Sequence, residues 1–304
     1  MRAIDLFAGL GGFTEGARLA GVRVVWAANH WRAAVDAHAA NHPEVVHACQ
    51  DLHQAAWADV PAHDVLLASP SCTGHTRARG RDLPHHDAAR STAWAVVSCA
   101  EVHRPDVVVV ENVVELRDWV LYPAWKMALG ALGYSVAEHV VDAADHGVAQ
   151  NRVRLFVVAA RSLAPLRLRL PKRDPVGFAS CLDADDLHDW RPVDSPGRAR
   201  NTLRRVAAGR EDHGSRFLVP YYGSARGGRS LSRPLGTVTT RDRYALVDGD
   251  RMRMLSVREY KRAMGFREDY RVPERPRRLG VHLLGNAVCP PVVEAILGEV
   301  RRRA

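Results

Sequence analysis

The first half of the chain alternates short β-branched runs with amphipathic stretches. The runs that we expect to form strands are residues 3–7, 22–27, 64–68, 106–110, 134–141 and 153–159. The helices expected between them are residues 14–20, 31–40, 92–103 and 123–132. Strands that alternate with helices in this way are typical of βαβ units around a mostly parallel sheet. The pattern therefore predicts an α/β, doubly wound, Rossmann-like domain.

The regular pattern stops between Pro165 and about Arg233. This segment is rich in Pro, Gly, Arg and Asp and shows no sustained period, which predicts a smaller, loop-rich second region. Beyond it we expect an extended segment, a helix, and a last helix that Pro290 and Pro291 open, since proline suits a first helical turn. These three segments are residues 234–247, 257–264 and 290–301. We predict one domain of residues 1–165, completed by 278–304, and a second region of residues 166–277.

Composition narrows the classes of protein that fit. The chain has 304 residues and a formal net charge of +9, which favours a polyanionic partner such as nucleic acid. Its longest apolar runs are too short to cross a bilayer, and Asp5 and the glycines after it interrupt any signal peptide. Five cysteines with no C-x-x-C pair fit a reducing compartment better than disulfides or a zinc site. We expect a cytoplasmic protein with no metal and no membrane.

A glycine-rich turn follows the first predicted strand, in the order Asp5-Leu6-Phe7-Ala8-Gly9-Leu10-Gly11-Gly12. Glycines let the backbone approach a ligand closely, and the helix that follows offers free amides, so a nucleotide-like ligand is one interpretation. Tight packing of strand and helix is the other. Asn29 and the pair Asp51-Leu52 follow the second and third strands, where they suit ribose and adenine. Turn and capping chemistry explains the same residues.

Cys72 lies on a loop just after an apolar strand, where open α/β sheets build their sites. Most free cysteines are small buried hydrophobic residues, and we expect this of Cys49, Cys99, Cys181 and Cys289. Cys72 differs because of its companions. The next strand ends in Glu111-Asn112-Val113, and a carboxylate there is costly unless it has a partner or a task. Further on, Arg152 and Arg154 share one face of a strand.

The order of these motifs resembles the C5-cytosine DNA methyltransferase family. The resemblance covers nearly the whole chain and rests on six motifs. They are Asp5 to Gly12, Pro70 to Cys72, Glu111 to Val113, Gln150 to Arg154, Arg233 to Thr239 and Leu284 to Val288. It implies a DNA (cytosine-5-)-methyltransferase that uses S-adenosyl-L-methionine, with residues 166–277 holding the target-recognition domain. Double-stranded DNA is the implied partner, with a monomeric enzyme and a possible companion restriction endonuclease.

The resemblance also implies a role for each site residue. Cys72 would add to C6 of a flipped-out cytosine, Glu111 would hold N3 and the exocyclic amine, and Arg154 would bind O2. Arg152 is the candidate cation that favours the thiolate of Cys72. The residues expected to bind the cofactor are Phe7, Gly9, Leu10, Gly11, Gly12, Asn29, His30, Asp51, Leu52, Pro70, Asn286 and Ala287.

The chain departs from the family pattern in three places. Ser71 precedes Cys72 where the family usually has proline, and Asn29 replaces a common acidic ribose ligand. The segment after Cys72 resembles a mobile catalytic loop but is rich in arginine: Gly74, His75, Arg77, Arg79, Gly80 and Arg81. Phosphate binding and a solvated basic loop are both open interpretations of it.

The recognised DNA sequence does not follow from the chain. Arginines that could contact guanines or phosphates are Arg198, Arg200, Arg204, Arg205, Arg210, Arg216, Arg226 and Arg229. Two alternatives remain beside the DNA methyltransferase. One is a tRNA cytosine-5 methyltransferase on the same scaffold, and the other is a catalytically inactive nucleic-acid-binding relative.

Overall fold

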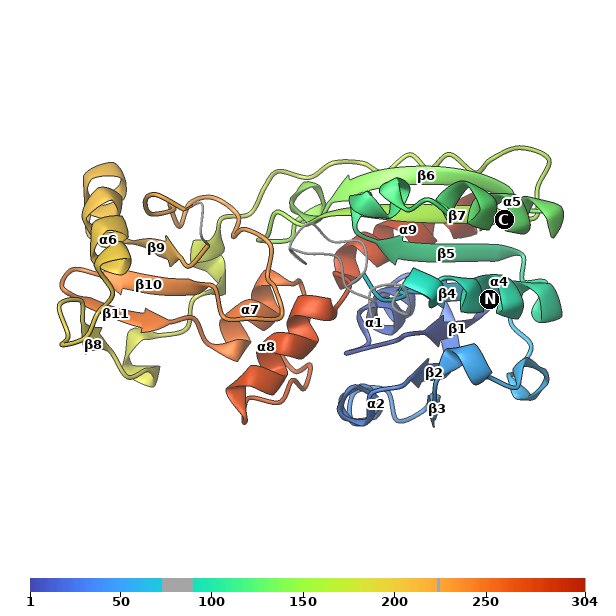
Figure 1. The fold of residues 1–304 in the computed structure, drawn as a ribbon, viewed down its shortest axis with the longest axis horizontal. Coiled ribbons are helices and arrows are strands. Elements are labelled where there is room, and N and C mark those ends of the chain that lie inside the picture. Colours follow the sequence, from blue (N-terminus) through green and yellow to red (C-terminus); the bar gives the residue numbers. More distant parts are fainter. Residues whose placement is uncertain (73–89, 223–224, 304) are drawn as a thin grey trace. The chain divides into compact units, whose positions relative to one another are not determined.

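The chain folds into two compact units. The computed structural model describes residues 1–72, 90–222 and 225–303 (Figure 1). The first unit comprises Met1–Asp142, Val153–Lys172 and Ala287–Ala304, and the second comprises Ala143–Arg152 and Arg173–Asn286. Compared with the boundaries expected from the sequence, residues 143–152 and 278–286 lie in the second unit rather than the first, and residues 166–172 lie in the first rather than the second. The predicted arginine-rich segment after Cys72 lies outside the described residues.

A seven-stranded sheet forms the centre of the first unit. Its strands, in spatial order, are β3 (Val46–Cys49), β2 (Arg23–Asn29), β1 (Arg2–Leu6), β4 (Val65–Ala68), β5 (Val107–Asn112), β7 (Val153–Ala160) and β6 (Ser135–Asp142). The strands from β3 to β5 are parallel, whereas β7 pairs antiparallel with both β5 and β6. The order reverses direction between β1 and β4, which is a switch point of the kind where such sheets bind ligands. The prediction of a doubly wound α/β domain is confirmed.

Helices cover both faces of this sheet. The apolar side chains of α4 (Trp94–His103) and α5 (Tyr122–Ala131) pack on one face of the sheet. They contact the same core as Leu66 and Val108, which are fully buried. On the other face lie α1 (Gly12–Leu19) and α9 (Pro290–Arg303), which pack against each other. The helix α2 (Arg32–Ala39) packs beside β2 and β3. Because both faces are covered, the central strands are apolar throughout.

The second unit is built on a four-stranded antiparallel sheet. Its strands, in spatial order, are β8 (Arg191–Pro192), β11 (Arg251–Met254), β10 (Tyr244–Asp248) and β9 (Arg216–Pro220). Its helices are α6 (Arg200–His213), α7 (Val257–Ala263) and α8 (Arg277–Asn286). A β-carbon added at Gly209 of α6 would lie 2.2 Å from the Phe217 ring, so glycine lets α6 approach β9 closely. Short 3₁₀ helices occupy Leu52–Gln54, Trp57–Asp59, Val114–Asp118, Ala143–His146, Phe178–Cys181 and Asp185–Leu187.

Several sequence expectations need correction. The helix α6 forms within the segment expected to lack regular structure, because it buries only a narrow stripe that includes Thr202 and Val206 among many arginines. Of the expected extended segment 234–247, only residues 244–247 lie in a strand, β10. Cys49 is exposed on the edge strand β3 and is therefore not a buried hydrophobic residue, whereas Cys99, Cys181 and Cys289 are buried as expected.

One stretch, Arg277–Arg303, is long and apolar enough by length and composition to cross a membrane. It is mostly buried within the protein, and its helical structure is interrupted between Asn286 and Pro290. The apolar side chains of α9, such as Val293, Ile296 and Leu297, are fully buried and provide the packing surface for α1.

Candidate functional site

Segments at the ends of three adjacent strands lie at one edge of the seven-stranded sheet. The loop after β4 contains Cys72, β5 ends with Glu111 and Asn112, and Arg154 is the second residue of β7. Because β7 runs antiparallel to β5, its first residues lie beside the last residues of β5, and Glu111 faces Phe156 across the pair. The structure thus brings the predicted nucleophile loop, carboxylate and one predicted arginine to the same edge.

Glu111 and Arg154 form a buried ion pair. The Nε atom of Arg154 lies 3.1 Å from Oε1 of Glu111, and the two side chains are only 16% and 9% exposed. Arg154 also donates from Nη1 to the carbonyl of Val153 at 2.8 Å. A carboxylate at an apolar strand end needs such a partner, since burying it alone would be costly. The pair fixes both side chains at the edge where Cys72 lies.

The loop that contains Cys72 is fastened to the neighbouring strand β5 and to the turn just before α4. Asn112 donates from Nδ2 to the carbonyl of Pro70 at 3.0 Å, and the amide of Ser71 donates to the hydroxyl of Thr92 at 3.1 Å. Pro70 is buried, whereas Cys72 is half-buried. Sequence reasoning named Asn112 only as part of a motif and did not identify Thr92. A buried amide directly after a candidate carboxylate was the available signal for Asn112.

The glycine-rich turn after β1 has an unusual backbone. Phe7, Gly9 and Gly11 have φ angles of 60°, 56° and 98°, in the left-handed region. Glycine reaches this region without steric cost, but Phe7 does not, so its conformation is held by the surrounding structure. Hydrogen bonds from the amide of Ala8 to Ala28 and from Gly11 to Ala8, of 3.0 and 2.9 Å, provide that constraint. The turn is therefore a fixed cradle at the carboxyl end of β1.

Gly12 is a glycine for a different reason. A β-carbon there would lie 2.0 Å from the carbonyl oxygen of Val288, and one at Gly16 would lie 2.7 Å from the carbonyl oxygen of Pro290. Both glycines let α1 pack closely against the start of α9 and the segment before it. The interpretation that the glycines serve tight packing of strand and helix thus applies to Gly12. Ala287, the residue before Val288, belongs to the same unit as the turn. Asn286 ends α8 in the second unit.

The remaining predicted cofactor residues follow β2 and β3 at the same edge. Asn29 accepts a hydrogen bond from the amide of Trp31 at 2.9 Å and begins the turn into α2. His30 is exposed, and Leu52 is buried. Asp51 caps a short helix by accepting from the amide of His53 at 3.0 Å, and this bond lowers the pKa of the Asp51 carboxyl. Since the Asp51 side chain is 58% exposed, it is available to hydroxyl groups of a ligand.

These features fit a nucleoside-bearing cofactor. The left-handed turn leaves open space at Gly9, where the nearest atom to an added β-carbon is 3.8 Å away. An ionised, exposed carboxylate at Asp51 and an amide side chain at Asn29 are suitable partners for hydroxyl groups. All of them follow the carboxyl ends of the adjacent strands β1, β2 and β3, next to the strand that leads to Cys72.

Gln150 and Arg152 belong to the second unit and stabilise it internally. The side chain of Gln150 accepts from the amide of Val238 at 2.8 Å and donates to the carbonyl of Ala263 at 3.1 Å. Arg152 is buried and donates to the carbonyls of Val238 and Gly285, each at 3.0 Å. Its electrostatic role toward Cys72 stays a prediction, while these contacts show that it joins three distant segments of its own unit.

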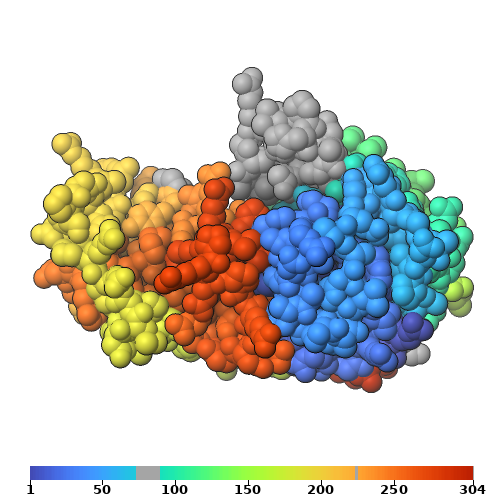
Figure 2. All heavy atoms as spheres, turned by 90° about the horizontal axis from the view of Figure 1, so that it is seen from below, coloured from blue at the N-terminus to red at the C-terminus, as the bar shows by residue number. Residues whose placement is uncertain are grey.

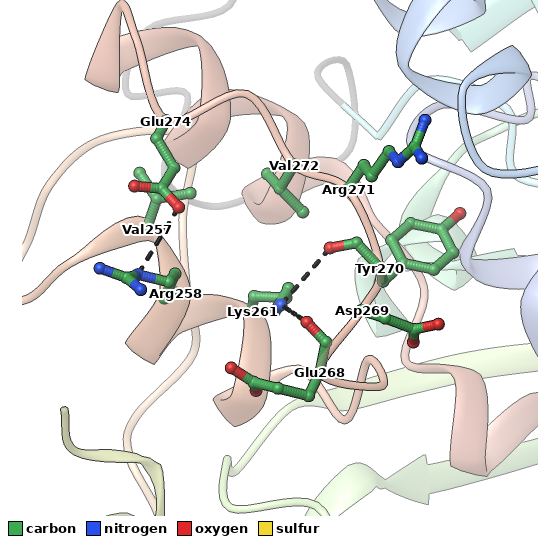
Figure 3. Close-up of a pocket in the computed structure, with 9 residues that line it drawn as sticks. All are labelled: Val257, Arg258, Lys261, Glu268, Asp269, Tyr270, Arg271, Val272 and Glu274. Carbon is green, nitrogen blue, oxygen red and sulfur yellow. Dashed lines mark hydrogen bonds and ion pairs between the residues drawn. The ribbon is translucent and has the colours of Figure 1, made fainter.

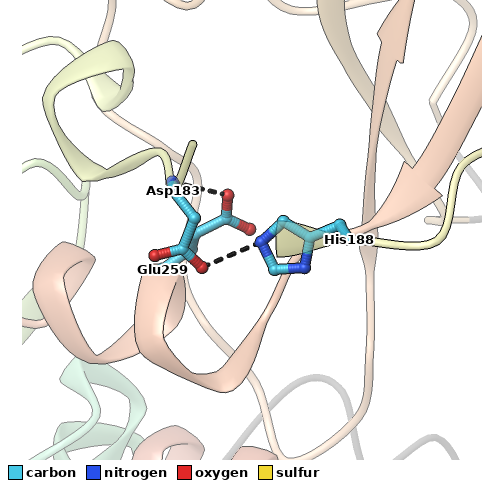
Figure 4. Close-up of side chains that lie close together, drawn as sticks. All are labelled: Asp183, His188 and Glu259. Atoms are coloured by element: carbon cyan, nitrogen blue, oxygen red, sulfur yellow. Dashed lines mark hydrogen bonds and ion pairs between the residues drawn. The ribbon is translucent and has the colours of Figure 1, made fainter. Parts of the chain in front are cut away.

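Two other features of the second unit are structural. Asp183, His188 and Glu259 have the spacing of a metal site (Figure 4). However, Arg253 donates to both oxygens of Glu259, at 2.8 and 2.5 Å, and Arg262 donates to Asp183 at 2.6 Å. The two guanidinium groups neutralise both carboxylates, and the cluster holds the start of α7, where Ser256 and Glu259 form a capping box.

A pocket of about 380 Å³ lies between α7 and the segment that follows it (Figure 3). Lys261 points into it and donates to the backbone carbonyls of Glu268 and Tyr270. Burial lowers the pKa of the Lys261 amine. The pocket contains none of the residues predicted to react or to bind the cofactor, so we assign it to the packing of this unit.

Comparisons with known proteins agree with this geometry. The family model "C-5 cytosine-specific DNA methylase" matches residues 1–176 and 195–302. Type II methyltransferase M.NlaX of Neisseria lactamica is 27% identical over 99% of this chain and 96% of its own length. M.HaeII of Haemophilus aegyptius is 26% identical over 98% of this chain and 92% of its own length.

Solved structures share the fold. The Dnmt2 methyltransferase of S. pombe has a TM-score of 0.72 at 16% identity and covers 100% of this chain and 98% of its own. A DNMT2 mutant of Spodoptera frugiperda has a TM-score of 0.71 at 17% identity, with 97% and 98% covered. The Rossmann-like fold of S-adenosylmethionine-dependent methyltransferases is thereby confirmed, and the chain belongs to the C-5 cytosine-specific DNA methylase family.

Proposed function

We propose that this chain methylates C5 of a flipped-out cytosine in double-stranded DNA through a covalent adduct between Cys72 and C6. The observation that supports it most directly is the buried Glu111–Arg154 pair, at 3.1 Å, on the edge that also presents the Cys72 loop. Cytosine C5 is a poor nucleophile, and adding a thiolate to C6 converts the ring into an enamine that is nucleophilic at C5.

Each residue of this edge has a separate role in the proposed reaction. The sulfur of Cys72 forms a bond to C6, while Glu111 gives or shares a proton at N3, so that no full negative charge builds up on the ring. Arg154 orients Glu111 and would donate to O2 of the base. After methylation at C5, a base removes the C5 proton, the C5–C6 double bond re-forms and the thiolate of Cys72 leaves. Arg152 acts in this scheme as the candidate cation that favours the thiolate.

S-adenosyl-L-methionine, when bound, supplies an electrophilic methyl group. The residues proposed to hold it are the left-handed turn from Phe7 to Gly11, Asn29, His30 and the exposed carboxylate of Asp51. Leu52, Pro70 and Ala287 would supply apolar walls, and Asn286 a polar contact. Gly12 supports this site indirectly, by letting α1 pack against the segment after Ala287.

The second unit is proposed to read DNA, and its arginines are not equivalent. Several of them already donate to the protein: Arg198 to Val193, Arg205 to Tyr222 and Ala225, Arg210 to Asp250 and Arg216 to Asp185. Within the described part of the chain, no hydrogen bond or ion pair engages the guanidinium groups of Arg200, Arg226 and Arg229. We propose these three as the DNA contacts.

The relatives named Type II methyltransferases support a further proposal, that the protein protects a site cut by a companion restriction endonuclease. We expect it to act as a cytoplasmic monomer. Expression in a host followed by sequencing of methylated cytosines would give the recognised site.

A covalent trap tests the mechanism. A duplex containing the recognised site with 5-fluorocytosine at the target should form a stable adduct in the presence of S-adenosylmethionine, because fluorine cannot leave as the C5 proton does. Cys72→Ser should form none while still binding DNA. A tRNA substrate assayed in parallel separates the RNA alternative. Methylation of DNA without any adduct on the wild-type enzyme would contradict the role of Cys72.

A further inference from the structure

A continuous row of polar side chains crosses the first unit behind the glycine-rich turn. Thr14 Oγ1 lies 2.8 Å from Oδ2 of Asp5 and 3.0 Å from Nε2 of His38. On its other side, Nδ1 of His38 lies 2.8 Å from Nε2 of His47. The four side chains come from β1, α1, α2 and β3, so this row, which we call the Asp5–His47 row, connects four elements.

One end of the row is in the core, and the other reaches the surface. Asp5, Thr14 and His38 are 0%, 3% and 1% exposed. His47 is only half-buried, on the edge strand β3, whose segment lies at the surface of the first unit in light blue in Figure 2. A proton can therefore reach solvent from His47 but not directly from Asp5.

The hydrogen bonds of the row can all point the same way when Asp5 is protonated. The Asp5 hydroxyl then donates to Thr14, the Thr14 hydroxyl donates to His38 Nε2, and His38 Nδ1 donates to His47 Nε2. The remaining nitrogen of His47 carries a proton in this state, and the backbone of Val45 favours protonation of this imidazole. Thr14 and His38 each donate once and accept once within the row, and both histidines are neutral.

The same row can point the opposite way with one proton fewer. Thr14 then donates to an ionised Asp5, His38 donates from Nε2 to Thr14, and His47 donates from Nε2 to His38. Between the two states each link passes on one proton, and the proton lost to solvent leaves from Nδ1 of His47. Atoms and charge balance, because Asp5 gains the negative charge that corresponds to the lost proton.

The electrostatics of the row allow this exchange near neutral pH. Burial raises the pKa of Asp5 to about 7, against the smaller opposing effect of its hydrogen bonds with Thr14. Burial and the neighbouring imidazoles of His42 and His47 hold the pKa of His38 well below its usual value, and burial also lowers the pKa of His47. Asp5 is therefore the member that titrates, and the histidines conduct as neutral groups.

Two acidic groups on the surrounding helices have partners of their own. Glu15 of α1 pairs with Arg18 at 2.8 Å, and Asp36 of α2 pairs with Arg32 at 3.1 Å. The ring of His42, in the segment after α2, lies 4.9 Å from that of His38, and Glu44 lies 3.9 Å from His42.

We propose that Asp5, Thr14, His38 and His47 form a proton relay that couples ligand binding at the glycine-rich turn to release of a proton through His47. Asp5 lies two residues before Phe7, and Thr14 lies two residues after Gly12, so both ends of the turn are fastened to the relay. Coupling to the cofactor rests on the proposed function, whereas the relay itself does not. In this role Asp5 and Thr14 are positioning residues.

The sign of the coupling follows from charge. S-adenosylmethionine has a positive sulfonium group, and a nearby positive charge favours the ionised form of a carboxyl group. The affinity of the protein for S-adenosylmethionine should therefore rise as the pH increases from 5.5 to 8.5. The rise should be about threefold if binding lowers the pKa of Asp5 by half a pKa unit, and about threefold more for each further half unit. S-adenosylhomocysteine, which lacks this charge, should show a smaller change.

Nitrogen-15 NMR of the histidine rings tests the relay in the free protein. The proton of His38 should be on Nδ1 at pH 5.5 and on Nε2 at pH 8.5. In Asp5→Asn the tautomer should not change over this range. A tautomer of His38 that is constant in the wild-type protein, or that changes equally in Asp5→Asn, would overturn the relay.

Thr14 provides a matched pair that keeps the test valid if Asp5→Asn does not fold. Thr14→Ser retains the hydroxyl link and should retain the tautomer change. Thr14→Val has nearly the same shape but no hydroxyl and should abolish it. Equal behaviour of the two variants would contradict conduction through Thr14.

Calorimetry then tests the coupling. Titrating S-adenosylmethionine into the protein at pH 7 in two buffers of different ionisation enthalpy should show release of at most about half a proton, because Asp5 is about half protonated at this pH. This release should be absent in Thr14→Val. Binding without proton release would overturn the coupling even if the relay is present. Absence of any binding would instead count against the proposed function, and the NMR result would still decide the relay.

Discussion

At the scale of single residues, the site depends on charges that are buried in pairs. Glu111 and Arg154 are both largely withdrawn from solvent and lie 3.1 Å apart. The loss of one partner would leave the other as an uncompensated buried charge, which is strongly destabilising. Folding as well as chemistry therefore requires both side chains. Only a substitution that keeps the shape of the side chain can separate its effect on stability from its effect on the reaction.

Glu111→Gln is such a replacement. It keeps the shape and one acceptor oxygen but cannot deliver a proton to N3, so we expect methylation to slow by about 10²- to 10⁴-fold. The rate of single-turnover methyl transfer is the appropriate measurement, with thermal unfolding as the control for stability. A variant that folds like the wild type and keeps its rate would exclude Glu111 from proton transfer.

Asp5 gives a pH dependence of stability with a definite sign. Its pKa is raised to about 7 in the folded protein, so between the unfolded value near 4 and pH 7 the folded state binds more protons than the unfolded state. Stability contributed by this group is therefore present below pH 4 and is lost as the pH rises to 7. Relative to Asp5→Asn, the wild type should lose about 2 kcal/mol of unfolding free energy between pH 5.5 and 8.

Urea denaturation of both proteins at several pH values measures this difference. The comparison with Asp5→Asn removes the contributions of other titrating groups, which the two proteins share. A gap between the two unfolding free energies that stays constant with pH would show that Asp5 is ionised throughout.

At the scale of elements, sequence periodicity predicted the strands and helices that bury a regular apolar face. The central strands and the helices α1, α2, α4, α5 and α9 were expected from apolar runs, and the structure has all of them. The edge strand β3 was not assigned a range, because its partly exposed sequence Val-His-Ala-Cys has no apolar pattern. The helix α6 was missed because its exposed arginines hide a narrow buried stripe.

The candidate site was predictable only in part, for a related reason. Motif residues such as Cys72 and Glu111 follow strand ends, and parallel strands bring their ends to one edge. Contacts between distant segments leave no local signal: the hydrogen bond from Ser71 to Thr92 and the row from Asp5 to His47 depend on tertiary packing. Likewise, the sequence could not distinguish arginines that bind backbone carbonyls from those that remain exposed.

Close packing of α1 on α9 predicts opposite effects of the same substitution at two helical glycines. At Gly16 a β-carbon would lie 2.4 Å from that of Val293, so Gly16→Ala should destabilise the protein by roughly 1 to 3 kcal/mol. At Gly130 of α5 no atom lies within 4 Å, so Gly130→Ala should stabilise it by roughly 0.5 to 1 kcal/mol. Thermal unfolding of the two variants measures both changes in stability. Stabilisation by Gly16→Ala would show that α1 and α9 are not in close contact.

At the scale of the whole molecule, positive charge is expected to dominate association with DNA. The formal net charge of +9 attracts a polyanion independently of sequence, whereas specificity needs particular exposed side chains. The arginines of the second unit that already pair with carboxylates, such as Arg216 with Asp185, contribute less to this attraction, because their charge is locally compensated.

DNA affinity should therefore fall steeply with salt. For a footprint of roughly six phosphates, we expect about a thousandfold loss between 50 and 200 mM salt. Arg226→Ala should reduce the slope of log affinity against log salt by about one, whereas Arg216→Ala should change it less. Fluorescence anisotropy with a labelled duplex measures both. Equal slopes for the two variants would contradict the assignment of Arg226 as a phosphate contact.

The packing of α9 against α1 has a consequence for biosynthesis. The glycine-rich turn and α1 leave the ribosome long before residues 288–293, which make the surface that Gly12 and Gly16 require. During translation the first helix must therefore wait, with its apolar face uncovered, until residues 288–293 have been synthesised. A nascent chain stalled before residue 288 should consequently recruit holdase chaperones.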